Sequence, residues 1–180
     1  VGARNFTGTA RMFNGGPIFI NINNVTSGVP SAGVNEGGYE MDNYSHDAQV
    51  VIYDGPDTRF TGEEILIGSN EEFVTIVNIS DKDNPVNLST ISYGQVGYTH
   101  QGWFTEDQRY FIMGDELDER DFGFPTRTLV FDFQSLTEPE LELSYEGPTD
   151  AIDHNGYVLD NKFYLANYTA GLRVLEIFRS

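Results

Sequence analysis

The chain contains three histidines, His46, His100 and His154, and both intervals between them are 54 residues long. Imidazole nitrogens bind zinc, copper and other transition metals. A side chain that recurs at a fixed interval occupies equivalent places in repeated structural units. If the units surround a common axis, the three imidazoles converge there. The spacing therefore predicts a three-histidine metal site with positions open to water or ligand. Two alternatives stay open: hydrogen bonding of each histidine within its own unit, and binding of an organic ligand.

Acidic and amide side chains lie close to the histidines along the chain. Asp115 and Glu116 are candidate metal ligands that would favour a hard cation such as Ca²⁺. The candidate cofactor is therefore a divalent metal: Zn, Cu or Ca. Partners that would orient the imidazoles or contact a ligand are Asp47, Gln101, Asp153, Asn155 and Arg173. The acidic run 115–121 is interpreted as a solvated loop, with calcium binding as the alternative.

Each histidine opens a similar series of strand-like segments. An apolar segment follows the histidine, and then come a turn, a second apolar run and a third run that alternates apolar and polar residues. The second runs are 64–69, 109–116 and 162–168, the third runs are 77–79, 131–133 and 175–177, and weaker fourth strands are 87–94 and 141–147. Alternation with period 2 and polar turns is typical of β-strands.

Four short strands in each repeat of about 54 residues predict an all-β fold, a β-propeller with four-stranded blades. We expect one region over 1–180, with blade parts at about 1–45, 46–99, 100–153 and 154–180. Propellers close with about four to eight blades. The chain is therefore expected to be a partial ring or a fragment of a longer propeller. A second chain or fragment would complete such a ring.

The repeat text resembles the choice-of-anchor B family of secreted β-propellers, which are built on LVIVD-type repeats. The segments that carry the resemblance are SHDAQVVIYDGPD (45–57), VNISDKDNP (77–85), YTHQGWFTEDQRYFIMGDELDE (98–119) and DHNGYVLDNKFYLANYTAGLRVLEI (153–177). It covers roughly residues 17 to 178. The resemblance implies a propeller exported to the cell exterior, and it implies no particular biochemical activity.

Composition excludes several classes of function. The chain carries 28 acidic and 10 basic residues, a net charge of −18, which argues against binding nucleic acid or anionic lipid. It has no cysteine, and no apolar run long enough to span a membrane. Six Asn-X-Ser/Thr sequons occur where composition predicts about two, as in a secreted glycoprotein. The candidate glycosylation sites are Asn5, Asn24, Asn43, Asn78, Asn87 and Asn167.

These features favour a non-enzymatic extracellular or surface-associated module. It would bind a protein, a glycan or a small ligand on one face of the propeller, with a metal or ligand near a histidine-lined central channel. No nucleophile elbow, HExxH pair or phosphate-binding loop is present in the sequence. The alternative function is a metal-dependent hydrolase that activates water on a three-histidine centre.

Overall fold

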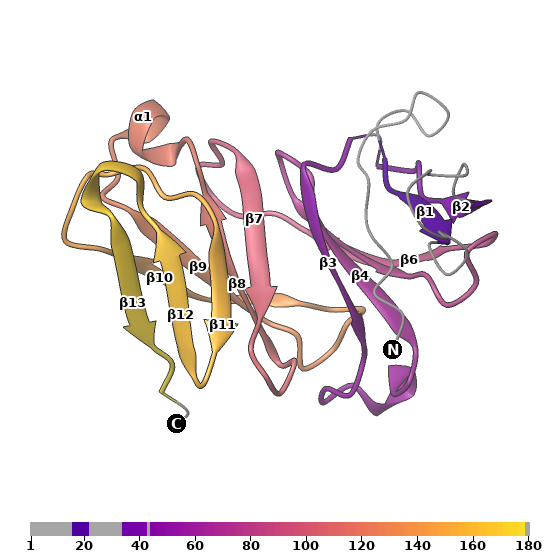
Figure 1. The fold of residues 1–180 in the computed structure, drawn as a ribbon. Helices are drawn as coiled ribbons and strands as arrows, with labels where there is room; N and C mark the ends of the chain where they lie inside the picture. Colours follow the sequence, from indigo (N-terminus) through magenta and orange to yellow (C-terminus); the bar gives the residue numbers. More distant parts are fainter. Residues whose placement is uncertain (1–15, 22–33, 43, 179–180) are drawn as a thin grey trace, which may run out of the picture.

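The computed structural model describes residues 16–21, 34–42 and 44–178, and these form four antiparallel sheets (Figure 1). The first sheet contains β1 (Ile18–Asn21) and β2 (Val34–Gly38). The second contains β3 (Asp47–Ile52), β4 (Glu64–Ser69), β5 (Val74–Asn78) and β6 (Val86–Ile91). The third contains β7 (Thr99–Phe104), β8 (Tyr110–Asp115), β9 (Arg127–Asp132) and β10 (Glu140–Glu146). The fourth contains β11 (Gly156–Leu159), β12 (Lys162–Ala166) and β13 (Leu172–Glu176).

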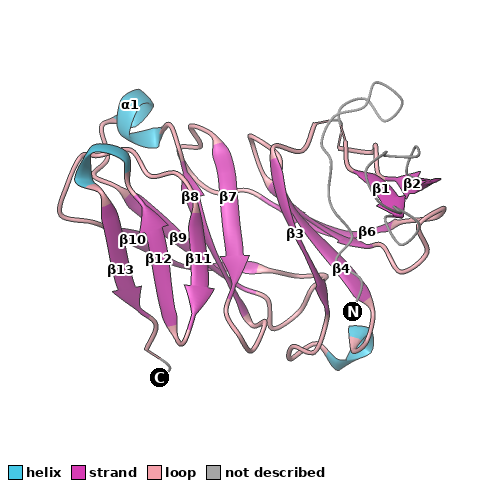
Figure 2. Ribbon diagram, viewed as in Figure 1, coloured by secondary structure: helices cyan, strands magenta, loops and turns pink. Residues whose placement is uncertain are grey.

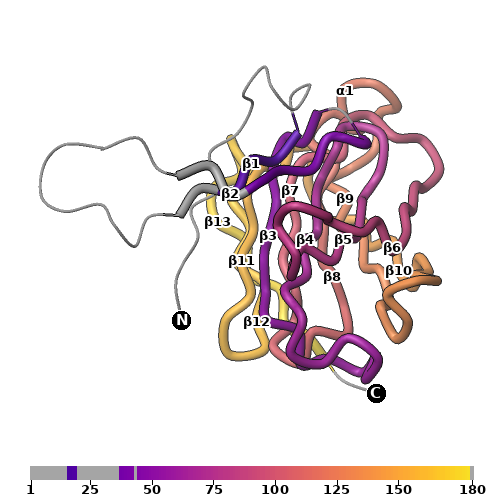
Figure 3. The backbone as a smooth tube through the Cα atoms, turned by 90° about the vertical axis from the view of Figure 1, so that its right-hand side faces the viewer, coloured from indigo at the N-terminus to yellow at the C-terminus, as the bar shows by residue number. Residues whose placement is uncertain are grey.

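The prediction of an all-β chain is confirmed. In every sheet each strand pairs with its neighbours in the chain, so the described connections within the second, third and fourth sheets are hairpins. The predicted second runs form β4, β8 and β12, and the predicted third runs coincide with parts of β5, β9 and β13. Figure 3 shows β3 and β7 on one side of the molecule and the fourth strands, β6 and β10, on the opposite side. The described part of the chain contains one short α-helix, α1 (Asp118–Phe122).

The central strands of the second and third sheets are buried on both faces, because each sheet lies between two neighbours, whereas the edge strand β10 is exposed along its whole length. On β4, Leu66 joins a cluster with Phe19 next to the first sheet, while Ile65 and Ile67 join a larger cluster shared with the third sheet. On β8, Ile112 packs toward the fourth sheet in the same way. Alternate side chains of a strand point to opposite faces, so continuous apolar runs are expected where both faces are covered.

Two glycines allow close packing beside the histidines. A Cβ atom on Gly102 would lie 2.3 Å from Phe111 Cε1, and one on Gly156 would lie 2.0 Å from Phe163 Cζ. In both sheets an aromatic ring of the second strand fills the place of the missing side chain on the first strand. Each of these glycines follows a histidine by two residues. The glycine–phenylalanine pair therefore recurs with the histidine in the second and third repeats.

The loop between β3 and β4 is tied to the third sheet by a buried carboxylate. Asp57 accepts hydrogen bonds from Arg59 Nη2 at 2.7 Å and from the backbone N–H of Leu136 at 2.9 Å. Arg59 also donates to Ser135 and Thr137. The hydrogen bonds from Arg59 lower the pKa of Asp57 below its ordinary value. The ionised form therefore stabilises the contact between the second and third sheets.

Replacing Asp57 by Asn should lower the free energy of unfolding at pH 7 by about 2 kcal/mol, because charge-assisted hydrogen bonds are lost. The folded-state pKa is depressed, so the wild-type advantage is complete above the unfolded pKa of about 4 and disappears as pH falls through the folded value. Urea unfolding at pH 7 and pH 3 measures both effects, with Asp54→Asn in the same loop as the control. An Asp57→Asn variant as stable as wild type at pH 7 would contradict the prediction.

Candidate metal centre

The three histidines lie at the same end of their sheets, where the first strand of each sheet begins. His46 directly precedes β3, His100 is the second residue of β7, and His154 lies just before β11. Strands β7 and β11 begin at the edge where α1 and the 3₁₀ helix Tyr168–Ala170 also lie (Figure 2). Strand β7 contacts both β3 and β11, so the first strands of three sheets are adjacent.

The structure brings the three imidazoles into a row. The ring centroids of His46 and His100 are 4.4 Å apart, and those of His100 and His154 are 4.6 Å apart. Tyr98 lies 5.2 Å from His46, and Tyr168 lies 5.2 Å from His154. Residues 54 positions apart in the chain are therefore neighbours in space, as the spacing predicted.

Within this row, His100, His154 and Glu116 offer a compact set of ligand atoms. One ligand atom from each residue lies within 4.8 Å of the others. His100 Nε2 is 3.4 Å from Glu116 Oε2, and His154 Nε2 is 3.7 Å from Glu116 Oε1. Two imidazoles and one carboxylate are a recognised donor set for zinc and for non-haem iron. The three residues therefore fit a transition metal.

The environment of His100 keeps its imidazole in the form that binds metals. His100 is 3% exposed, and burial lowers the pKa of its ring, with the neighbouring His46 and His154 acting in the same direction. Its Nδ1 atom has no hydrogen-bond partner among the described residues. Glu116 opposes this shift. At neutral pH the ring is therefore uncharged and keeps a lone pair for a metal.

Polar side chains at the ends of the second strands hold the histidine segments in place. Asp115, at the end of β8, accepts hydrogen bonds from the backbone N–H groups of Gly97 and Tyr98, just before His100. Asn167, just after β12, donates to the carbonyls of Ala151 and Ile152, just before His154. Asp115 is fully buried, and its bonds to the backbone give it a positioning role rather than a place in the ligand set.

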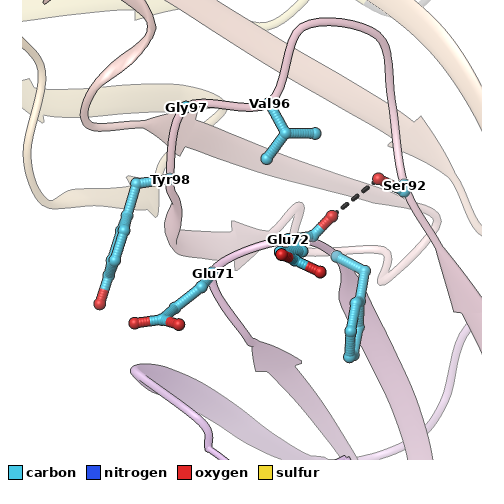
Figure 4. Close-up of a pocket in the computed structure, with 7 residues that line it drawn as sticks. Glu71, Glu72, Ser92, Val96, Gly97 and Tyr98 are labelled. Carbon is cyan, nitrogen blue, oxygen red and sulfur yellow. Dashed lines mark hydrogen bonds between the residues drawn. The ribbon is translucent and has the colours of Figure 1, made fainter. Parts of the chain in front are cut away.

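His46 differs from the other two histidines because two tyrosine hydroxyls form hydrogen bonds with one of its ring nitrogens. The hydroxyls of Tyr44 and Tyr98 both lie 3.1 Å from His46 Nδ1. Each of these tyrosines precedes a histidine by two residues. This recurrence is visible in the sequence and could have indicated the tyrosine–histidine contact, which we did not predict. Tyr98 also lines a shallow pocket with Glu71, and in Figure 4 the Tyr98 hydroxyl and the Glu71 carboxylate lie on the same side of it. His46 therefore adjoins the ligand set without belonging to it.

The remaining predicted partners have distinct surroundings. Gln101 is buried and bonds the backbone of Gly156 through both ends of its amide, linking β7 to β11. Asp47 caps the N–H of Ala48, beside His46. Arg173, on β13, donates to Thr149. Tyr168, which we did not predict, donates to Glu116 at 2.7 Å and thereby orients the carboxylate of the ligand set.

A group of buried acids lies beside the ligand set. Asp153 is 1% exposed, and α1 contributes Asp118 and Glu119, of which Asp118 is fully buried. Burial raises the pKa of Asp118 to about 6 and that of Glu119 to about 8, and it raises the pKa of Asp153 well above its ordinary range. The interpretation of 115–121 as a solvated loop was wrong for Asp118 and Glu119, because both side chains are buried and Asp118 pairs with Arg127 of the third sheet. The Oδ1 atom of Asn155 is also buried without a hydrogen-bond partner among the described residues.

The sequons have different outcomes. Asn5, Asn24 and Asn43 lie outside the described residues. Asn78 and Asn87 are half-buried, and their amides donate to Glu63 and Tyr39. Asn167 is 1% exposed, so its prediction as a glycosylation site was wrong: the side chain is enclosed and bonded inside the fold.

No family model matches this chain, and no curated protein matches it either. None of the helices among the described residues has the length and apolar character needed to cross a bilayer.

Proposed function

We propose that this chain is part of an extracellular β-propeller that binds a transition metal through His100, His154 and Glu116. The single observation that carries the proposal is the meeting of these side chains, from two successive repeats, within 4.8 Å. As a binding module, the protein would present the metal, or a ligand held by it, at the exposed edge of the sheets.

The sheet arrangement supports a propeller arc. The second and third sheets have four strands in chain order, their first strands adjoin, and successive sheets pack face to face through apolar clusters. This is the relation between neighbouring blades about an axis. Within the described residues, β13 has a strand neighbour on one side only. A second chain or fragment that completes the ring would pair with that edge.

The chemistry of the edge supports a metal rather than a purely structural cluster. His100 is buried, and its Nδ1 atom has no hydrogen-bond partner among the described residues. Binding of a metal would use the lone pairs of His100 and His154 and compensate the half-buried Glu116 carboxylate. The acidity of the chain, its sequons and its resemblance to the choice-of-anchor B family support a location at the cell exterior.

Cobalt titration of the metal-free protein tests this proposal, because Co²⁺ substitutes for Zn²⁺ and its visible absorption reports nitrogen and oxygen ligands. We expect saturation at one ion per chain, and displacement by Zn²⁺. The His46→Ala variant serves as the matched control, since it removes a neighbouring imidazole outside the ligand set. The absence of any stoichiometric Co²⁺ or Zn²⁺ binding would refute the metal site and leave the histidines a structural role.

A metal-dependent hydrolase is the second candidate function. Two histidines and one glutamate leave coordination positions for water, and a metal would supply Lewis acidity to that water. Turnover of esters or phosphodiesters that stops on chelation and returns with Zn²⁺ would support this function. A protein that binds the metal but turns over none of these substrates is a binding module.

A further inference from the structure

Strand β13 is an edge strand whose outer side pairs with no other described strand. The second and third sheets have four strands each, whereas the described part of the fourth sheet has three, in the order β11-β12-β13 (Figure 1). Directly after β13, the N–H of Ile177 donates to the carbonyl of Asn161 on the β12 side. Backbone groups of alternate residues point to opposite edges of a strand, so those of Leu172, Val174 and Glu176 face away from β12. They are therefore available to another strand.

An apolar groove lies beside β13, between the third and fourth sheets. Its volume is about 720 Å³. Val130 and Leu143 line the wall on the third sheet, and Phe163 and Leu175 line the wall on the fourth. A strand that covered both walls would remove this apolar surface from water, which is favourable.

The corresponding place between the second and third sheets is covered. The hydroxyl of Ser89 on β6 donates to the carbonyl of Leu136, which follows β9, and Ile91 packs against the apolar cluster that contains Leu136. The counterparts of Ser89 and Ile91 on β10 are Leu143 and Tyr145, which are 52% and 39% exposed. A strand beside β13, with the turn that leads into it, would cover them in the same way.

The rim of the groove is acidic. Glu142 of β10 and Glu176 of β13 line it, and no ion pair among the described residues includes either of them. Arg109, the basic residue of the lining, donates to the Asp132 carboxylate at 2.8 Å, so its charge is compensated. The chain as a whole has a net charge of −18. A basic strand would therefore be attracted to the groove, whereas a second copy of this chain would be repelled.

We infer that the edge of β13 and its groove bind an extended segment of a partner protein in which apolar and basic residues alternate. Alternate side chains of a strand point to opposite faces, so apolar residues enter the groove beside Leu175 and basic residues lie opposite Glu176. Backbone hydrogen bonds to β13 supply affinity, and the alternation supplies specificity. The inference rests on the proposed propeller arc for the position of the added strand. It does not require that a metal bind at His100 and His154.

Binding of short fluorescent peptides to the full chain, followed by anisotropy, tests the inference. The probe is a peptide of about six residues in which valine and lysine alternate, the usual length of a strand. One control peptide has glutamate in place of lysine, and another has the same valines and lysines in two blocks. We expect the alternating lysine peptide to bind, the block peptide to bind at least about tenfold more weakly, and the glutamate peptide not to bind.

Variants of the edge and of the rim locate the peptide. Val174→Pro removes a backbone donor that faces the open edge and should weaken binding about tenfold or more, whereas Val174→Thr should not. Proline is tolerated on an edge strand at an N–H that faces solvent, so the fold should persist. Glu142→Gln combined with Glu176→Gln should weaken binding about fivefold or more. Glu140→Gln combined with Glu146→Gln removes the same charge from exposed positions outside the groove and should change binding by less than about twofold.

The inference would be overturned if the alternating peptide failed to bind, if the block peptide bound equally well, or if the two charge-removing pairs lost affinity equally. Unchanged affinity in Val174→Pro would overturn it too. So would a dimer of the chain in analytical ultracentrifugation that Val174→Pro dissociates, since a second copy would then occupy the edge. Co²⁺ titration of the same samples keeps the metal site separate. His100→Ala should bind the peptide as wild type does, and loss of peptide binding with intact Co²⁺ binding would reject this inference alone.

Discussion

Glu116→Gln should weaken Co²⁺ and Zn²⁺ binding by about 100-fold or more, the largest functional effect that we expect from one substitution. The glutamine keeps the size of the side chain but removes the only anionic member of the donor set, between His100 and His154. A change of this size equals about 2.7 kcal/mol of binding free energy. Competition with a chromophoric chelator at constant pH measures it. Because the carboxylate is 20% exposed, the substitution should leave the fold intact.

Glu72→Gln is the matched control for this prediction. Glu72 is an exposed acid that lines the shallow pocket near Tyr98, and it has no place in the ligand set. It should change the affinity for Co²⁺ by less than about twofold, through long-range electrostatics alone. Equal losses in the two variants would show that the metal responds to the overall acidity of the chain, and the assignment of Glu116 as a ligand would then fail.

Gly156→Ala should lower the free energy of unfolding by about 3 kcal/mol, which is the upper end of the cost of overpacking a core. The new methyl group would lie 2.0 Å from Phe163 Cζ, and Phe163 is 1% exposed, so the ring has little room to move. For a chain of this size the change corresponds to a fall in Tm of about 6–12 °C. Thermal and urea unfolding of the metal-free protein measure it without interference from metal binding.

Gly94→Ala separates this packing effect from the loss of glycine flexibility. An added Cβ at Gly94 would meet no atom within 4 Å, and the substitution should alter stability by less than about 0.5 kcal/mol. Gly102→Ala, which faces Phe111 in the preceding repeat, should behave like Gly156→Ala. If Gly156→Ala were as stable as Gly94→Ala, the glycine–aromatic pair would not explain why a glycine follows His100 and His154 at the same interval.

The strands and the proximity of the histidines could be predicted because both depend on periodic features of the chain. Short apolar runs bounded by turns define β4 and β8 locally, and residues at one position of a repeat are adjacent when the repeats pack side by side. The imidazoles of successive repeats are adjacent, as that rule predicts, with ring centroids 4.4 Å and 4.6 Å apart. The repeat rule treats the three histidines as equivalent, however, so it cannot predict which of them belong to the ligand set.

The tertiary structure gives the three histidines different surroundings, because the residues around them are not repeated. Asn70 directly follows β4, whereas Glu116 directly follows β8, so a carboxylate is present between His100 and His154. The burial of Asp118 and Glu119 is equally non-local: the sequence there is that of a solvated acidic loop, whereas in the structure both side chains are buried and Asp118 pairs with Arg127 of β9. Repetition thus specifies which elements recur and lie side by side, while contacts between distant residues decide which side chains lose water and share a ligand.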